Sequence, residues 1–170
     1  TIAFLITGPA PLTAPATVQN VSCAGACNGS IQVSAQGGTP TYVYTWSPVP
    51  PNGQGTANAL GLCPGPWSVT IADANGCDTT LSFNITEPTP LATTVSVTQS
   101  LCQVCNGTAL LNTTGGNVPY TYIWGPPLNL TTTDPLQQNL CAGLYTVTVS
   151  DGLGCTENLV VPITDSNAEV

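Results

Sequence analysis

The chain has 170 residues, of which eight are carboxylates and none is Lys, Arg or His, so its formal net charge is −8. Nucleic-acid binding depends on cationic side chains that contact phosphates, so nucleic acid is excluded as a partner. An anionic membrane surface would also repel this chain. The longest apolar run, residues 2–6, is far too short to span a bilayer, and we expect no direct membrane insertion.

Residues 1–12 resemble the end of a repeat, not its beginning. Ile2, Phe4 and Ile6 alternate as on a strand, and the same pattern returns 79 residues later at residues 81–85. We therefore predict an orphan last strand. Either it belongs to a preceding domain of a longer array, or the chain begins here and donates this strand to the sheet edge of a neighbouring copy, as in fibre assembly.

Residues 13–90 form the first predicted repeat. Short alternating stretches indicate strands near residues 17–22, 31–35, 42–46, 57–60, 67–71 and 81–85. Residues 48–55 are rich in Pro and Gly and predict a loop. Because no stretch has a helical period, the pattern is typical of an all-β antiparallel sandwich.

The strongest pattern occurs twice, at residues 62–77 and 140–155, with a period of 78 residues. In the first copy, Trp67, Val69 and Ile71 alternate with polar or small neighbours, and a turn at residues 73–76 follows. A period of this length predicts two domains, the second at residues 91–170. Proline at positions 88 and 90 predicts a short, stiff joint between them.

Eight cysteines, four in each repeat, predict disulfides and therefore an oxidising compartment. Four cysteines allow three pairings in each domain. A Cys63–Cys77 bridge is disfavoured because the extended strand between them is roughly 30 Å long. Zinc is disfavoured because the Cys102-x-x-Cys105 spacing is wider in the first repeat and the chain has no His, so we expect no metal and no cofactor.

Two weaker patterns have simple structural interpretations. Asp73, Asn75 and Asp151 are weak candidates for calcium ligands, but an Asx turn explains them more simply. Trp46 and Trp124, with the neighbouring tyrosines, would suit a sugar-binding face, although their period of two favours core packing. Catalysis lacks an ordinary base and the acids are scattered, so we expect that the protein is not an enzyme.

A long motif then identifies a family resemblance. Val-Ser-Cys, Cys-Asn-Gly-Ser, Gly-Gly-Thr-Pro, Tyr-x-Tyr-x-Trp and Asp-x-x-Gly-Cys follow one another at residues 21–77, and most of the motif returns in the second repeat. This resembles the SprB-type repeat of cell-surface adhesins in gliding Bacteroidota. The resemblance implies tandem Ig-like domains, secretion to the cell surface and a role in adhesion, motility or fibre building.

The resemblance also implies a disulfide pairing in which an outer pair encloses an inner pair. The implied bridges are Cys23–Cys77 and Cys27–Cys63 in the first repeat, and Cys102–Cys155 and Cys105–Cys141 in the second.

These observations together predict a non-enzymatic, extracellular structural protein, the stalk of an adhesin or the body of a surface filament. Its expected partners are neighbouring repeats or copies of itself, and surface glycans are a further candidate. Two alternatives remain open: a filament subunit that polymerises by donating residues 1–12, and a carbohydrate-binding module that uses the Tyr and Trp strands.

Overall fold

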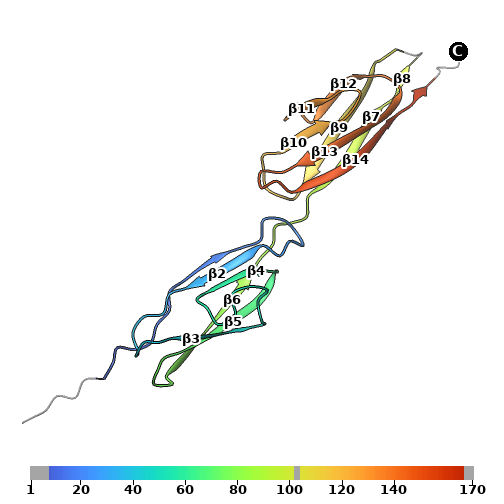
Figure 1. Cartoon of the computed structure of the whole chain (residues 1–170). Coiled ribbons are helices and arrows are strands. Elements are labelled where there is room, and N and C mark those ends of the chain that lie inside the picture. The colour runs from blue at the N-terminus through green and yellow to red at the C-terminus, as the bar shows by residue number, and fades with distance from the viewer. Residues whose placement is uncertain (1–7, 102–103, 167–170) are drawn as a thin grey trace, which may run out of the picture. The chain divides into compact units, whose positions relative to one another are not determined.

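The computed structural model describes residues 8–101 and 104–166, and every regular element in those ranges is a β-strand. The chain divides into two compact units, Thr1–Glu87 and Pro88–Val170, which we call unit 1 and unit 2. Each unit consists of two facing layers of antiparallel strands (Figure 1). The all-β antiparallel sandwich expected from the sequence is therefore confirmed.

Unit 1 contains six strands in two sheets of three. The first sheet has the order β1-β2-β4 and the second has the order β3-β5-β6, with every pairing antiparallel. Their bounds are β1 (Ala16–Gln19), β2 (Gly29–Val33), β3 (Val43–Ser47), β4 (Asn58–Leu62), β5 (Gly65–Ala72) and β6 (Asp78–Ile85).

The core of unit 1 follows from the alternation along β5. Trp67, Val69 and Ile71 are buried, whereas the alternate side chains lie on the outer side of the sheet. Trp46 of β3 is 1% exposed and Ile31 of β2 is fully buried, so both sheets contribute to one apolar cluster. Burial of these side chains is the main force that holds the two layers together.

Unit 2 repeats this plan with additional strands. One sheet has the order β12-β9-β7 and the other β11-β10-β13-β14, and a parallel pair joins β8 to β15. Their bounds are β7 (Ala92–Thr98), β8 (Ser100–Leu101), β9 (Gly107–Thr114), β10 (Thr121–Trp124), β11 (Leu130–Thr132), β12 (Leu136–Leu140), β13 (Gly143–Ser150), β14 (Thr156–Ile163) and β15 (Asp165–Ser166).

The strand order of both units is that of an immunoglobulin-type sandwich. If β1 to β6 are taken as strands A, B, C, E, F and G, the two sheets are A-B-E and C-F-G, as in constant-type domains without strand D. Unit 2 keeps this order and adds β11 next to β10, at the position of strand C′. A buried tryptophan on strand C, another feature of this fold, is present as Trp46 and as Trp124.

The segment before β1 packs on unit 1. The carbonyl oxygen of Ala10 accepts a hydrogen bond from the N–H of Gly38 at 2.7 Å, and Leu12 packs against the core cluster. In unit 2, the carbonyl oxygen of Thr89 accepts the corresponding bond from Gly116 at 2.8 Å. The residues before each first strand thus contact the unit that follows, so the division falls after Glu87, three residues before the boundary at 90 expected from the sequence.

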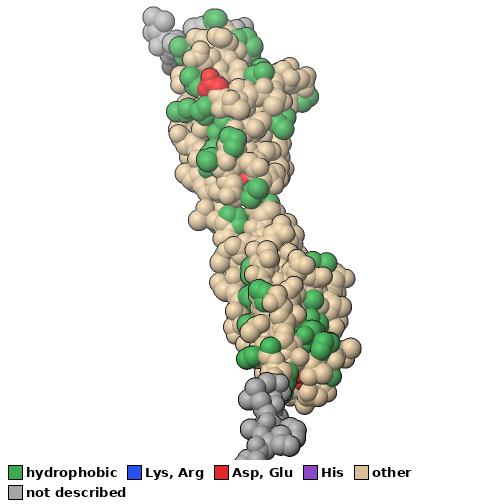
Figure 2. Space-filling model, turned by 90° about the vertical axis from the view of Figure 1, so that its left-hand side faces the viewer, with side chains coloured by type: hydrophobic (Ala, Val, Ile, Leu, Met, Phe, Trp, Pro, Cys, Tyr) green, Lys and Arg blue, Asp and Glu red, His purple; other side chains and the backbone are tan. Residues whose placement is uncertain are grey.

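The visible surface is almost uncharged. Figure 2 shows separate hydrophobic side chains dispersed among neutral polar groups and backbone on both units, with few acidic side chains. Among the exposed apolar residues are Val49, Val118, Leu144 and Val160, which belong to different loops and strands. Single exposed apolar side chains are ordinary on protein surfaces and do not by themselves indicate a binding face.

Candidate functional site

One disulfide in each unit joins the loop before strand B (β2 or β9) to the loop between strands E and F (β4 and β5, or β12 and β13). Cys27 is bonded to Cys63 in unit 1, and Cys105 is bonded to Cys141 in unit 2, each over a sequence separation of 36 residues. We call these two bridges the clamps. Cys27 and Cys63 come close because Gly29 of β2 pairs with Leu62 of β4.

The Cys23–Cys77 bridge implied by the family resemblance is wrong, because Cys77 is a free, exposed cysteine. The reason is geometric. The clamp keeps Cys23 and Cys63 at the end of unit 1 where β5 begins, whereas Cys77 lies in the turn after β5 ends. An eight-residue strand is roughly 26 Å long, far beyond the ~7 Å limit between Cα atoms of a disulfide.

Several predicted residues fall outside the part that the structure describes. Cys102 is one, so the predicted Cys102–Cys155 bridge stays a prediction, although Cys155 itself is disulfide-bonded. Ile2, Phe4 and Ile6, the predicted assembly strand, also lie outside the described residues.

Asp73 organises the turn that contains Cys77. One of its carboxylate oxygens accepts N–H bonds from Asn75 and Cys77, both at 2.9 Å, and the other accepts the N–H of Thr39 at 2.9 Å. The side-chain amide of Asn75 donates to the hydroxyl of Thr39. Both carboxylate oxygens therefore serve backbone groups, which supports the turn interpretation of Asp73 and Asn75 over the calcium interpretation.

Asp151 makes the same turn in unit 2. It accepts N–H bonds from Leu153 and Cys155 on one oxygen and from Asn117 on the other. The pKa of Asp73 is lowered, chiefly by the bond from Thr39. For Asp151 desolvation is the largest influence and acts to raise the pKa, but the N–H bonds together outweigh it and the pKa is lowered.

A further hydrogen bond connects each clamp to the core. The indole N–H of Trp67 donates to the carbonyl oxygen of Cys63 at 3.0 Å, and the hydroxyl of Tyr145 donates to that of Cys141 at 3.0 Å. This arrangement corresponds to the tyrosine corner of immunoglobulin domains. Sequence reasoning missed it, although an aromatic residue four positions after a cysteine in both repeats was a visible signal.

The three tryptophans belong to the core of their units. Trp46 and Trp124 are each 1% exposed and Trp67 is 8% exposed. Trp46 also donates its indole N–H to the carbonyl oxygen of Thr56. Because stacking on a sugar ring requires an exposed aromatic face, these three tryptophans do not supply the face that the carbohydrate-binding alternative needs.

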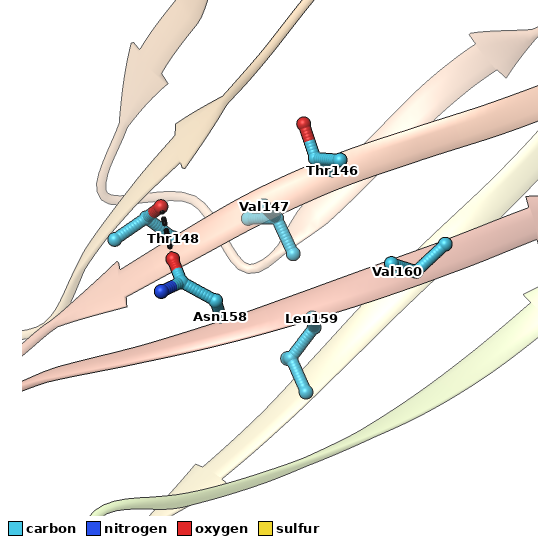
Figure 3. A pocket seen from close by; sticks show the side chains of 6 residues that line it. All are labelled: Thr146, Val147, Thr148, Asn158, Leu159 and Val160. Carbon is cyan, nitrogen blue, oxygen red and sulfur yellow. Dashed lines mark hydrogen bonds between the residues drawn. The ribbon is translucent and has the colours of Figure 1, made fainter.

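A depression of about 320 Å³ lies on the outer side of β13 and β14 (Figure 3). Thr148 and Asn158 form a hydrogen bond across these strands, and Val160 stands beside them, 63% exposed. The lining holds no acid or base: Thr146, Val147, Thr148, Asn158, Leu159 and Val160. The depression therefore offers shape but no catalytic chemistry.

Within 8–101 and 104–166, no three His, Cys, Asp or Glu side chains gather as a metal site would require. The same residues form no helix of the length and apolarity needed to cross a membrane.

The family model of the SprB repeat matches residues 16–50, which confirms the resemblance for the first half of the first repeat. No curated protein matches the chain. The extension of the repeat over the second half of the chain stays a prediction.

The solved structures that match this chain have low sequence identity to it. They include a 282-residue C-terminal fragment of intimin, in complex with the intimin-binding domain of its translocated receptor (13% identity, TM-score 0.46), a Dscam chain (15%, 0.40) and the amphioxus IgVJ-C2 molecule (13%, 0.37). The alignments cover 95%, 94% and 89% of this chain respectively. The chain spans 66% of the intimin fragment, 47% of the Dscam chain and 96% of the amphioxus chain.

Proposed function

We propose that this chain is a load-bearing part of the stalk of a cell-surface adhesin or surface filament, and that it acts outside the cell and catalyses no reaction. The observation that carries the proposal is the repeated clamp: two successive units of the same fold, each with a disulfide at the same position. The match to the SprB repeat supports a surface location, and disulfides suit an oxidising compartment.

The position of the clamp suits a protein under tension. The Cys27–Cys63 bond spans a sequence separation of 36 residues and encloses β2, β3 and β4. When the chain is pulled, these residues cannot extend even if the unit unfolds. At ~3.6 Å for each residue, each clamp withholds roughly 130 Å of extension.

Single-molecule pulling tests this mechanical role. The chain, held at both termini, should unfold in two events whose contour length is short, and a reducing agent should lengthen each event by roughly 130 Å. A chain in which both clamp cysteines of unit 1 are changed to Ala should show one long and one short event without reductant. Two long events in the oxidised wild-type chain would contradict the proposal.

Antibody labelling tests the location. Antibodies raised against the purified chain should label intact cells of the organism that encodes it, and electron microscopy should show the label along surface fibres. Labelling that requires permeabilised cells would overturn the proposal. A matched control uses antibodies against a cytoplasmic protein, which should label only after permeabilisation.

A further inference from the structure

The outer side of the β11-β10-β13-β14 sheet of unit 2 carries exposed apolar side chains on neighbouring strands. Ile123, Leu144 and Val160 point outward from β10, β13 and β14 and are 43%, 71% and 63% exposed. Val160 pairs with Thr146, which makes Val160 and Leu144 diagonal neighbours whose side chains are within reach of each other. We call the outward side chains of β10, β13 and β14 the β13 face.

The matching surface of unit 1 is more polar. The strand registers of the two sheets correspond at a spacing of 78 residues. Thr45 therefore stands where unit 2 has Ile123. Ser82 stands where unit 2 has Val160. Unit 1 forms the same sandwich without apolar residues at these positions, so the fold does not require them, and the surface of unit 2 needs another explanation.

The β13 face also lacks charge. In the four strands of this sheet, all of which the structure describes, the only charged residue is Glu157, and it alternates with Leu159 and Val161 on the inner side. Two copies of a chain of net charge −8 repel each other through their carboxylates, but they can meet at this face without bringing carboxylates together. Its Thr and Asn side chains both donate and accept hydrogen bonds, so the face is compatible with its own copy.

The shape of the β13 face is self-complementary as well. The depression of about 320 Å³ extends from Thr146 towards Thr148 and is open to the outside (Figure 3). Leu144 projects from β13 two residues before Thr146, and Thr148 lies two residues after it. A twofold axis that passes over Thr146, perpendicular to β13, would bring the Leu144 of each copy over the depression of the other. One surface thus supplies both the projection and the depression of an isologous contact.

We propose that two copies of this chain pair through their β13 faces. Four strands spaced ~4.8 Å apart, with eight residues in β13, give a face of about 500 Å². A dimer would therefore bury about 1,000 Å² in total, at the lower end of the range for specific interfaces. The association is weak and reversible. It does not rest on the proposed function, and its failure would leave the pulling and labelling results unchanged.

Sedimentation of the full 170-residue chain tests the pairing. The chain carries Cys77→Ser, so that its free thiol forms no intermolecular disulfide. We expect a reversible dimer as the concentration rises to about 1 mM. Added NaCl should strengthen it, because salt screens the repulsion between two acidic chains. A monomer at every concentration would overturn the proposal and leave the β13 face to a different protein partner.

Two matched variants locate the contact. Leu144→Glu should raise the dissociation constant of the dimer at least about tenfold, because it removes an apolar contact and brings two carboxylates together. Val43→Glu, on the outer side of unit 1, should leave it unchanged, although Val43 is also 60% exposed. Thermal unfolding checks that both variants fold. A dimer that persists in Leu144→Glu, or that Val43→Glu weakens equally, would overturn the proposal.

A cysteine on the proposed axis tests the symmetry. Thr146→Cys, in the Cys77→Ser chain, should form an intermolecular disulfide with oxidised glutathione, because residue 146 of one copy faces residue 146 of the other. Two thiols are oxidised to one disulfide and glutathione disulfide is reduced to two thiols. Ser68→Cys, at the matching position of unit 1, should remain a single chain on a non-reducing gel. A covalent dimer absent from Thr146→Cys, or equally abundant in Ser68→Cys, would overturn the twofold packing.

Discussion

The two units build the same sandwich but complete the edge next to strand C differently. In unit 2, β11 pairs with β10, and Leu130 lies opposite Trp124. In unit 1, the Pro- and Gly-rich loop takes this place, and the side chain of Gln54 accepts the backbone N–H of Trp46 at 3.2 Å. A backbone donor at this edge needs a partner, and the comparison shows that a strand or a single amide side chain can supply it.

The tryptophans of strand C differ in the same region. The indole N–H of Trp46 donates to the carbonyl oxygen of Thr56, whereas the indole N–H of Trp124 is buried without a hydrogen-bond partner. Both units have a buried indole ring on strand C, but only unit 1 has a hydrogen bond to its N–H. Shape and apolar area therefore explain the tryptophan at this position better than its hydrogen bond does.

Removal of the clamps should have the largest effect and should be equal in the two units. Each closes a loop of 36 residues, for which chain entropy predicts about 4 kcal/mol of stabilisation. Double Cys→Ala variants, Cys27/Cys63 in one chain and Cys105/Cys141 in another, should lower the free energy of unfolding of their own unit by that amount. Denaturant titration followed by tryptophan fluorescence measures it. A large inequality would contradict the equivalence of the clamps.

Replacement of the strand C tryptophans should reduce the stability of the two units by different amounts. Trp46→Phe loses a hydrogen bond and leaves the Thr56 carbonyl without its donor, whereas Trp124→Phe removes a buried N–H that has no partner. Both variants lose similar apolar area. We expect Trp46→Phe to cost about 1–2 kcal/mol more in the free energy of unfolding than Trp124→Phe. Equal losses would show that the indole bond contributes nothing.

The hydrogen bonds from Trp67 to Cys63 and from Tyr145 to Cys141 should depend on a donor group at this position more than on which aromatic ring carries it. Tyr145→Phe removes the hydroxyl that donates to Cys141 and should cost about 1 kcal/mol. Trp67→Phe removes the corresponding N–H in unit 1, while Trp67→Tyr restores the donor type of unit 2. Thermal unfolding should rank Trp67→Tyr above Trp67→Phe, and the reverse order would contradict a common corner.

Loss of the turn aspartates should have the smallest effect on stability, and this effect should depend on pH in the same way in both units. The folded pKa values of Asp73 and Asp151 are both lowered, so their contributions are fully present above the unfolded pKa of about 3.9 and are lost as the pH falls through the folded pKa. Asp73→Asn and Asp151→Asn should each lower the thermal midpoint at pH 7. The difference from the wild type should shrink below about pH 4. A difference that stays constant down to pH 2 would contradict this assignment.

The sequence was most informative where one side chain in two faces the core. The alternation of Trp67, Val69 and Ile71 predicted β5, and the structure buries all three. The predicted first strand at 17–22 ends earlier, at Gln19, because the residues that follow form the cysteine-bearing turn. A period of two predicts which side chains are buried, but it does not indicate the residue at which the strand ends and the turn begins.

The Cys23–Cys77 error has a different origin. The length of β5 excludes a bridge from Cys63 to Cys77, and it excludes Cys23 as well once Cys27 and Cys63 are joined. The second exclusion depends on knowing the clamp, which the positions of the cysteines alone do not provide. The Asp73 turn, in contrast, was visible in Asp-Ala-Asn-Gly, because its bonds run between residues close in sequence.

The use of Trp67 in one unit and Tyr145 in the next has a consequence for biogenesis. Neighbouring domains of near-identical sequence can exchange strands while they fold and become trapped in misassembled forms. Units that make the same bond with different side chains fit a neighbour's core less well than their own. Sequence drift between consecutive domains would thus protect a nascent chain from strand exchange, and the corner tolerates that drift without loss of its hydrogen bond.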